Sequence, residues 1–207
     1  MEKKYVIWHV QGGLGKNIAA SSLTKDIKEK YKDRELILVC SFPEVFLNDS
    51  NIDKVYAIGT HPYFYENYIE NKDVIIFKHE PYDQTGHITR KKHLIENWCD
   101  LLDIKYTKQQ PYFPINYPQN KLSLQWVRQK PILLLQTTGG PFISPTEKPS
   151  PYEWARDLPI ELAQILVDKY SSKYHIIQIS RQGGYPLQNV ERIDTPMSNM
   201  ELFSLVG

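Results

Sequence analysis

The part of this sequence best suited to chemistry is a glycine-rich turn with a lysine behind it. Gly12, Gly13 and Gly15 follow the apolar run 5–10 and precede Lys16. Glycines lack the Cβ atoms that keep a ligand away from the backbone, and the first N–H groups of a following helix have no intrahelical partners. A strand, a glycine turn and a helix N-terminus in this order suit an anion such as a phosphate. The alternative is a tight turn that needs glycine only for its geometry.

The same turn invites comparison with the phosphate-binding loop of nucleotide hydrolases. In that loop a serine or threonine follows the lysine and binds magnesium, but here Asn17 takes its place. The full spacing of that loop is absent, and no acidic residue ends the next apolar run, 36–40. The dinucleotide fingerprint G-x-G-x-x-G is not met either. A magnesium-dependent nucleotide hydrolase is therefore the weaker interpretation.

A second set of polar groups ends an apolar run in the other half of the chain. Thr137 and Thr138 follow the run 132–136 and precede Gly139 and Gly140. The carboxyl ends of parallel strands are where open α/β sheets bind their ligands. Two hydroxyls and the adjacent N–H groups could donate hydrogen bonds to a phosphate there, and an ordinary strand terminus is the alternative.

Apolar runs that alternate with helical periodicities predict an α/β fold. An apolar stripe predicts one helix after the first strand, and Thr89 is the predicted N-cap of a later helix that carries Leu94 and Trp98. Ser198 and Glu201 form a capping box ahead of the last helix. The predicted strands are 5–10, 36–40, 55–59, 73–77, 132–136 and 175–179, and the stripe is Ala19, Leu23, Ile27 and Tyr31.

Prolines between residues 111 and 118 separate a first lobe, 1–117, from a second lobe, 118–207. The second lobe has about two predicted strands, whereas a doubly wound lobe usually has about five or six, so it looks incomplete. Without later strands, 175–179 is expected to present an open edge, and the apolar face of 200–206 lacks part of what it would pack on. We therefore expect the 207-residue chain to self-associate through its second lobe and to be inactive on its own.

The composition excludes several classes of function. Of the 207 residues, 41% are hydrophobic, and 25 basic against 24 acidic side chains give a net charge of +1. This balance creates no global field toward nucleic acid, so no such partner is expected. The N-terminal apolar run is too short for a secretory signal, and no run approaches transmembrane length. We expect a cytoplasmic protein.

Four features follow one another in a fixed order. They are the glycine turn with small residues at 18–22, the strand 36–40 followed by 43–46 and 52–55, the Thr137-Thr138 strand end followed by 154–159, and the segment 174–180 followed by 197–206. In this order they resemble glycosyltransferase family 9, the heptosyltransferase-like enzymes that build lipopolysaccharide cores. The resemblance spans essentially the whole chain but roughly the first two-thirds of such an enzyme. It implies the GT-B fold, with two facing Rossmann-like lobes, the second of them incomplete here.

The resemblance implies a transferase that moves a sugar from a nucleoside-diphosphate sugar to a glycan or lipid-linked acceptor, without a metal or other cofactor. In the family the second lobe holds the donor, and the residues that match its diphosphate contacts are Thr137, Thr138 and Arg156. The glycine turn of the first lobe then faces the acceptor. A lipid-linked acceptor would bring the protein to the inner face of the membrane as a peripheral enzyme.

One residue departs from the family's pattern at the catalytic position. Members commonly carry an acid directly after the glycine turn, proposed as the base that deprotonates the acceptor hydroxyl, and here Lys16 stands there. A protonated lysine accepts no proton, although it can orient an anionic group of the acceptor. His9, Glu80 and Asp83 are the residues that could replace the acid, because each lies at or just beyond the end of a predicted strand.

Two alternatives to the transferase stay open. One is a nucleotide-binding module built on the glycine turn, which magnesium-dependent ATP turnover would favour. The other is a non-catalytic fragment that keeps the GT-B fold. Thermal stabilisation by a nucleoside-diphosphate sugar would favour the transferase. The basic run 90–93 is either a solvated helix start or a contact for an anionic acceptor.

Overall fold

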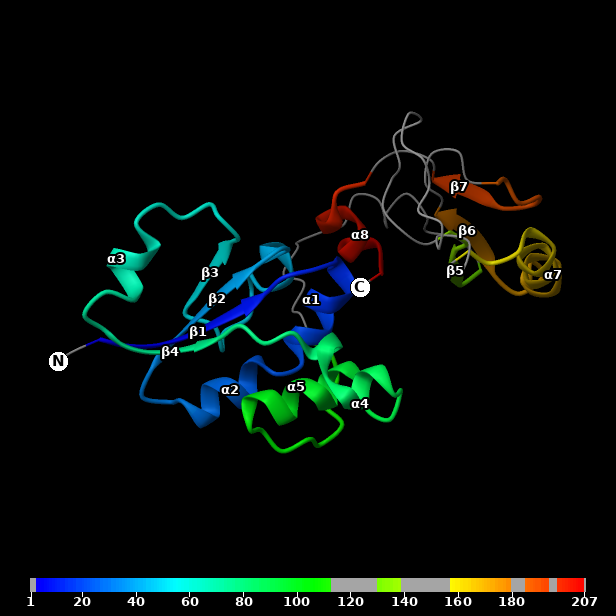
Figure 1. Ribbon diagram of the computed structural model, residues 1–207. Coiled ribbons are helices and arrows are strands. Elements are labelled where there is room, and N and C mark those ends of the chain that lie inside the picture. Colours follow the sequence, from blue (N-terminus) through cyan, green and yellow to red (C-terminus); the bar gives the residue numbers. More distant parts are fainter. Residues whose placement is uncertain (1–2, 113–129, 139–156, 180–184, 194–196, 207) are drawn as a thin grey trace, which may run out of the picture. The chain divides into compact units, whose positions relative to one another are not determined.

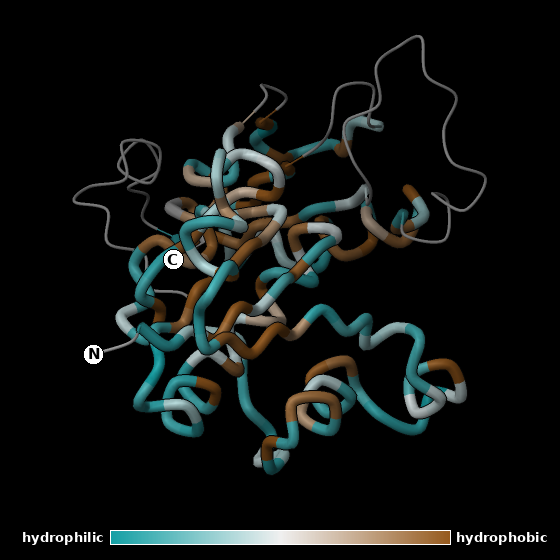
Figure 2. Tube along the Cα trace, turned by 60° about the vertical axis from the view of Figure 1, so that its left-hand side comes forward, coloured by the Kyte–Doolittle hydropathy of each residue, from teal (hydrophilic) through white to brown (hydrophobic). Residues whose placement is uncertain are grey.

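The computed structural model describes residues 3–112, 130–138, 157–179, 185–193 and 197–206 (Figure 1). The chain divides into two compact units, Met1–Asn116 and Tyr117–Gly207. This division lies one residue from the lobe boundary that the sequence predicts. Each unit contains a parallel sheet, which confirms the α/β class. Figure 2 shows hydrophobic stretches alternating with hydrophilic ones along the chain.

The first unit is built on a four-stranded parallel sheet. Its strands are β1 (Lys4–Val10), β2 (Glu35–Cys40), β3 (Lys54–Ala57) and β4 (Asp73–Phe77), in the order β3-β2-β1-β4. β1 is buried through its middle, as its continuous apolar run predicts. Because β1 and β4 are parallel neighbours, their carboxyl ends meet at the same edge of the sheet.

Helices lie on both faces of this sheet. α2 (Thr24–Lys30) and α5 (Leu94–Leu102) lie on one face, and α3 (Phe64–Tyr68) lies on the other (Figure 1). Trp8 of β1 meets Trp98 of α5 edge to face, with ring centroids 5.7 Å apart, while Tyr5 meets Tyr68 of α3 at 5.4 Å. Successive side chains of a strand point to opposite faces, so β1 supplies core residues to both layers.

The first predicted helix is divided into two. α1 (Leu14–Ser21) ends before α2 begins, whereas the apolar stripe predicts one continuous helix. The hydroxyls of Ser21 and Ser22 each donate to a backbone carbonyl three residues earlier, both at 2.7 Å. Such local bonds compete with the regular helical pattern and allow the chain to turn. Leu23 and Ile27 are nevertheless fully buried, as the stripe predicts.

The prediction of Thr89 as an N-cap is wrong. The N-cap of α5 is His93, whose Nδ1 accepts a hydrogen bond from the Ile95 N–H at 3.3 Å. Thr89 instead follows the short helix α4 (Thr85–Ile88), and its hydroxyl donates to the carbonyl oxygen of Thr85 at 2.7 Å. An imidazole nitrogen therefore caps this helix, in place of the hydroxyl that the sequence predicts.

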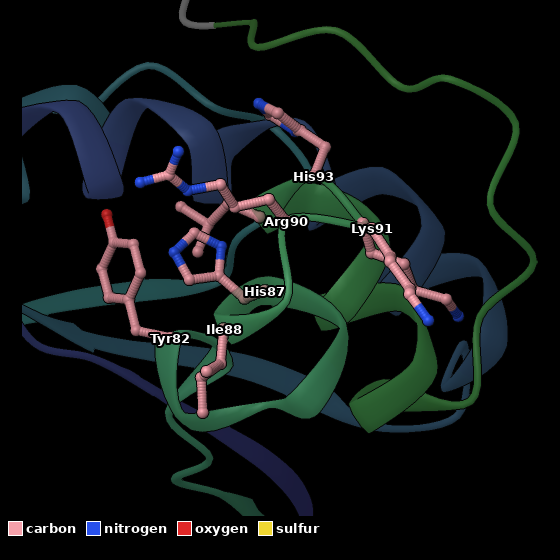
Figure 3. A pocket seen from close by; sticks show the side chains of 8 residues that line it. Tyr82, His87, Ile88, Arg90, Lys91 and His93 are labelled. Carbon is pink, nitrogen blue, oxygen red and sulfur yellow. The ribbon is translucent and has the colours of Figure 1, made fainter.

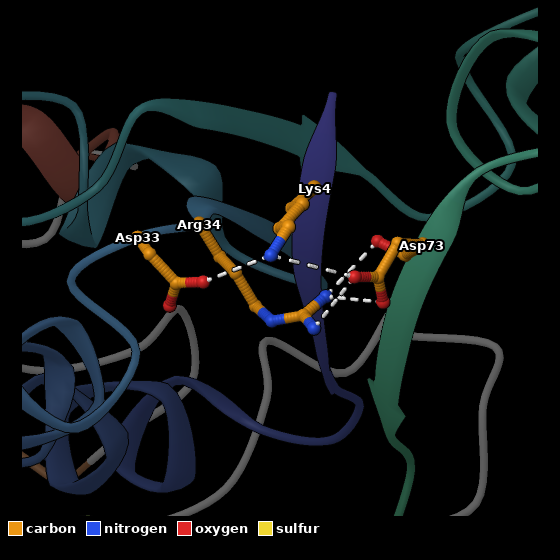
Figure 4. A network of polar contacts seen from close by, with 4 residues as sticks. All are labelled: Lys4, Asp33, Arg34 and Asp73. Carbon is orange, nitrogen blue, oxygen red and sulfur yellow. Dashed lines mark hydrogen bonds and ion pairs between the residues drawn. The ribbon is translucent and has the colours of Figure 1, made fainter. Parts of the chain in front are cut away.

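An ion-pair network joins the amino ends of the strands in the first unit (Figure 4). Arg34, just before β2, donates to both carboxylate oxygens of Asp73, the first residue of β4, at 2.8 and 2.9 Å. Lys4 of β1 lies 3.4 Å from Asp33 and 3.9 Å from Asp73. The hydrogen bonds from the Arg34 guanidinium lower the pKa of Asp73. These charges sit at the end of the sheet away from the glycine turn.

The second unit has a three-stranded parallel sheet with a helix on each face. Its strands are β5 (Ile132–Gln136), β6 (His175–Ile179) and β7 (Glu191–Ile193), in that order. α7 (Ile160–Tyr170) packs Ala163 and Val167 into a cluster with Ile176 of β6. On the other face, Leu205 of α8 (Asn199–Val206) packs against a cluster that contains Ile177 of β6.

The predicted capping box at the start of α8 is confirmed. The Ser198 hydroxyl accepts a hydrogen bond from the Glu201 N–H at 3.2 Å, and the Glu201 carboxylate accepts one from the Ser198 N–H at 2.8 Å. These bonds to Ser198 lower the pKa of Glu201. Two N–H groups at the helix start are thereby satisfied.

The expectation of an open edge at 175–179 is wrong. β7 pairs with β6, so β6 is an inner strand. β7 was not predicted from the sequence, because this strand is only three residues long and two of its residues are charged. The last helix is also better packed than expected, since Phe203 is only 5% exposed.

Candidate functional site

The glycine turn is shaped by one glycine and left open by two others. Gly12 has a φ of +123°, and a Cβ added there would lie 3.0 Å from Cδ of Lys16. Gly13 and Gly15 adopt ordinary backbone conformations, and a Cβ at either would meet no described residue within 4 Å. The turn therefore needs glycine for its geometry at Gly12 alone, and the space over the other two is free for a ligand.

Asn17 holds the turn from inside. Its Nδ2 donates to the carbonyl oxygens of Gly12 and Gly13 at 3.2 and 3.0 Å, and the side chain is fully buried. The Gly12 N–H donates to the hydroxyl of Ser41, beyond β2, at 3.1 Å. Asn17, the residue that departs from the phosphate-loop pattern, thus stabilises the conformation of the turn. Its Oδ1 is buried and has no hydrogen-bond partner among the described residues.

Lys16 and Glu80 form an ion pair beside the turn. Lys16 lies in the first turn of α1, and Glu80 follows β4, so the adjacent carboxyl ends of β1 and β4 bring them together. The Lys16 side chain is 6% exposed and that of Glu80 is 40% exposed. Lys16 Nζ also lies 5.2 Å from the ring centroid of Tyr82 and 5.9 Å from that of Trp98. A buried ammonium is thereby paired with a carboxylate that solvent can reach.

The second Glu80 oxygen has a backbone partner. Its Oε1 accepts a hydrogen bond from the Tyr82 N–H at 3.3 Å, which makes Glu80 the N-cap of the 3-10 helix η2 (Pro81–Asp83). The carboxylate is therefore held at both oxygens. A positioned carboxylate next to an accessible backbone turn is suited to accept a proton from a bound hydroxyl.

The other two candidate bases lie elsewhere. His9 lines an apolar hollow of about 280 Å³ on the α3 face of the sheet, together with Lys78. Burial, reinforced by the charges of Lys78 and Lys16, lowers the pKa of His9. Asp83 is exposed at the end of η2. Within the part of the chain that the structure describes, no ion pair joins His9 or Asp83 to Lys16.

A basic hollow of about 790 Å³ lies at α4 and the start of α5, and Tyr82 of η2 also lines it (Figure 3). Figure 3 shows Arg90 beside Tyr82 and His87, with Lys91 directed to the opposite side. Lys92 is paired with Asp100 at 2.6 Å, whereas Arg90 and Lys91 have no ion pair among the described residues. The lining residues are Tyr82, His87, Ile88, Arg90, Lys91, Lys92, His93 and Leu94, and none of them is acidic. This hollow suits an anionic group.

In the second unit, Thr137 and Thr138 follow the carboxyl end of β5, and both are buried. The Thr137 hydroxyl accepts a hydrogen bond from Nε2 of Gln178 at 3.1 Å, and the Thr137 carbonyl accepts one from the Leu158 N–H at 2.9 Å. For the Thr138 hydroxyl the structure records no partner among the residues it describes. The two threonines are therefore not equivalent, because the Thr137 oxygen accepts the Gln178 amide and no such bond is recorded for Thr138 among the described residues.

Gln178 is the residue of this region that sequence reasoning missed. It is fully buried on β6, where its Nε2 also donates to the Tyr185 carbonyl at 3.0 Å and its Oε1 accepts from the Leu187 N–H at 3.1 Å. The one signal was a polar residue inside the apolar run HIIQI. Arg156, Gly139 and Gly140 lie outside the described residues.

Solved structures that resemble this chain are glycosyltransferases. Bacterial iron-containing dodecameric glycosyltransferase TibC from enterotoxigenic E. coli matches 100% of this chain and 52% of its own, with a TM-score of 0.63 and 12% identity. A glycosyl transferase family 9 protein from Veillonella parvula matches 99% of this chain and 74% of its own, with a TM-score of 0.61 and 8% identity. The heptosyltransferase TibC in complex with ADP-D-beta-D-heptose matches with a TM-score of 0.58 and 13% identity.

These likenesses confirm the predicted fold, which is the α/β fold of the GT-B glycosyltransferases. The chain spans about half the length of TibC, at 52%. No family model matches the chain, and no curated protein matches its sequence.

Two features are absent from the described part of the chain. None of its helices is long and apolar enough to cross a membrane. No group of three or more His, Cys, Asp or Glu side chains in it could hold a metal ion.

Proposed function

We propose that this protein is a glycosyltransferase that joins a sugar from a nucleoside-diphosphate donor to an anionic acceptor. The observation that carries the proposal is the Glu80 carboxylate, held by Lys16 beside an open glycine turn. The GT-B fold supports the reaction class, since the solved neighbours are transferases. Hexosyl or heptosyl transfer to a glycan or lipid-linked acceptor of the lipopolysaccharide type is the finer form of the proposal.

Glu80 is the proposed base. Its carboxylate takes the proton of the acceptor hydroxyl, whose oxygen then forms a bond to the anomeric carbon of the donor sugar. The bond from that carbon to the diphosphate breaks, and the nucleoside diphosphate leaves with the electron pair. The buried Lys16 ammonium orients the Glu80 carboxylate. The acid that the family carries after the glycine turn is thus replaced by Glu80, which follows the neighbouring strand β4. Positioned bases of this kind contribute about 10²–10⁴-fold to a rate.

The donor diphosphate is proposed to bind at the end of β5. The Thr138 hydroxyl and the N–H groups that follow would donate to it, while Thr137 stays bonded to Gln178 and keeps the strand end in place. Arg156, which the family resemblance assigns to the diphosphate, remains a candidate for a bidentate contact. The acceptor's negative charge is assigned to Arg90 and Lys91, because Lys16 already has a partner.

The test has a binding arm and a transfer arm. Thermal stabilisation of the protein by ADP, UDP or GDP sugars supports the donor site, and release of the nucleoside diphosphate in the presence of an acceptor then measures transfer. The Glu80→Gln variant should keep the stabilisation and lose transfer. Magnesium-dependent ATP hydrolysis, without any response to sugar nucleotides, would instead establish the nucleotide-hydrolase alternative.

A further inference from the structure

α7 is apolar on two faces. Its inner face carries Ala163 and Val167, both fully buried against the sheet of the second unit. Its outer face carries Leu162, Ile165 and Leu166, which are 53%, 58% and 38% exposed. A surface helix normally presents charged and polar residues on the side away from the core. The outer apolar residues of α7 therefore need an explanation other than the core of their own unit.

The spacing of the outer residues makes a stripe. Residues three and four apart are neighbours on a helix, so Leu162 contacts the same surface as Ile165 and Leu166. Lys169 continues the stripe one turn after Ile165, and Glu161 borders it one turn before. Neither Lys169 nor Glu161 has an ion pair among the described residues, and the Lys169 ammonium lies 5.4 Å from the ring centroid of Tyr170.

We propose that a second copy of this chain covers the stripe, with two α7 helices packed antiparallel about a two-fold axis near Ile165. A two-fold interface uses the same patch on both copies, so each patch must complement itself. The stripe meets that requirement, because an axis at Ile165 brings Lys169 of each copy beside Glu161 of the other. Apolar residues then meet at the centre, and two opposite-charge pairs lie at the ends.

The other charged residue on this part of α7 is already engaged within its own unit. Asp168 accepts a hydrogen bond from Gln164 at 2.9 Å, and Gln164 in turn accepts one from the Gln188 N–H at 2.9 Å. These hydrogen bonds hold Gln164 and Asp168 in place on the side of the stripe that faces Gln188. Glu161 and Lys169 are the charged residues one turn before and one turn after Ile165, so they are the ones that an axis at Ile165 brings together. The charges thus select an antiparallel copy over a parallel one, which would place like charges together.

The expected dimer is weak and reversible. A stable interface buries about 800 Å² per partner, which is more than one helix face supplies, so residues around α7 must add to it. This interface differs from the edge-strand association that the sequence suggested, because β7 occupies that edge. The inference rests on the second unit alone and does not depend on the proposed transferase activity.

Sedimentation equilibrium of the full 207-residue chain tests the proposal. The wild-type chain should dimerise, and Ile165→Glu should weaken the dimer at least tenfold. Leu47→Glu changes an equally exposed residue of the first unit, 60% exposed, and should leave it unchanged. Circular dichroism melts of each variant establish that it is folded.

A charge exchange separates this geometry from any other contact. Glu161→Lys and Lys169→Glu should each weaken the dimer, and the double variant should restore it, because the two pairs form again with opposite sign. A wild-type chain that stays monomeric at every concentration would overturn the proposal. So would a dimer that Ile165→Glu leaves intact, or a double variant weaker than both single ones.

Discussion

The glycine turn after β1 and the threonine pair after β5 occupy the same place in two parallel sheets, but different forces hold them. At the glycine turn, a buried ammonium is paired with the Glu80 carboxylate. At the threonine pair, the neutral amide of Gln178 bonds to a hydroxyl and to two backbone groups. The first arrangement offers a proton acceptor, and the second offers hydrogen-bond donors.

This difference follows the chemistry that each end would perform. Deprotonating an acceptor needs a positioned base, and the Glu80 carboxylate is given a fixed orientation by its ion pair with Lys16. Binding a diphosphate needs donors without a competing negative charge. The two strand ends are therefore expected to respond differently to substitution, to backbone strain and to pH.

Replacement of the Glu80 carboxylate should have the largest effect. We expect Glu80→Gln to slow transfer by about 10²–10⁴-fold, the usual contribution of a positioned base. Asp83→Asn is the matched control, because Asp83 follows three residues later and is exposed. Steady-state transfer rates at saturating donor measure both. Equal losses in the two variants would remove Glu80 from its assigned role.

Loss of the Gln178 amide should mainly affect stability. Gln178→Leu leaves a hydroxyl, an N–H and a carbonyl in the second unit without their partner, and a buried unsatisfied group costs about 1–3 kcal/mol. Gln164→Leu removes a comparable amide that is tied to Gln188 at the surface, and a much smaller loss is expected. Urea unfolding followed by circular dichroism compares them. Similar unfolding free energies for the two variants would show that the buried Gln178 hydrogen bonds stabilise the protein no more than the surface ones of Gln164 do.

The two glycines of the turn should behave differently from each other. Gly12→Ala forces a side chain into a positive-φ conformation and against Lys16, so we expect a loss of about 1 kcal/mol or more. Gly13→Ala should be nearly neutral for stability. Gly13→Val should also leave the fold intact while obstructing the acceptor. If Gly13→Val left acceptor use unchanged in an active protein, the glycine turn would have a purely structural role and would not contact the acceptor.

The smallest expected effect is a pH dependence confined to the first unit. The pKa of His9 is lowered from its ordinary 6.5, so the unfolded chain takes up a proton before the folded one does. Stability should therefore fall as the pH drops below about 6.5, and His9→Gln should flatten that fall. Urea midpoints at pH 7.5 and pH 5.5 measure it. A fall of the same size in the variant would assign it to other groups.

Local sequence patterns predicted most of the sheets and little of the site's internal bonding. Six strands are visible in the sequence as apolar runs, whereas β7 is too short and too charged to be predicted. The Lys16–Glu80 pair joins residues 64 positions apart, so only the strand order β1-β4 could reveal it. The break between α1 and α2 depends on serine hydroxyls that bond backward, which an apolar stripe does not show.

The same reasoning explains the wrong expectation of an open edge at 175–179. The sequence showed a strand with no later partner, and the structure supplied one. The sequence shows Leu162, Ile165 and Leu166 on one face of the predicted helix, where they would be expected to pack on the core, but Ala163 and Val167 are the residues buried against the sheet. The solvent exposure of each side chain shows which apolar face of α7 is buried, and sequence periodicity alone does not.

The division of labour between the two strand ends is tested most directly by donor titration of three chains. Isothermal titration calorimetry of the wild type, Thr138→Val and Lys16→Met with ADP, UDP and GDP sugars identifies which end binds the diphosphate. We predict that Thr138→Val weakens donor binding by about tenfold, the equivalent of one lost hydrogen bond to a charged group, while Lys16→Met leaves it unchanged. Loss of donor affinity in Lys16→Met alone would place the donor on the glycine turn and contradict the account.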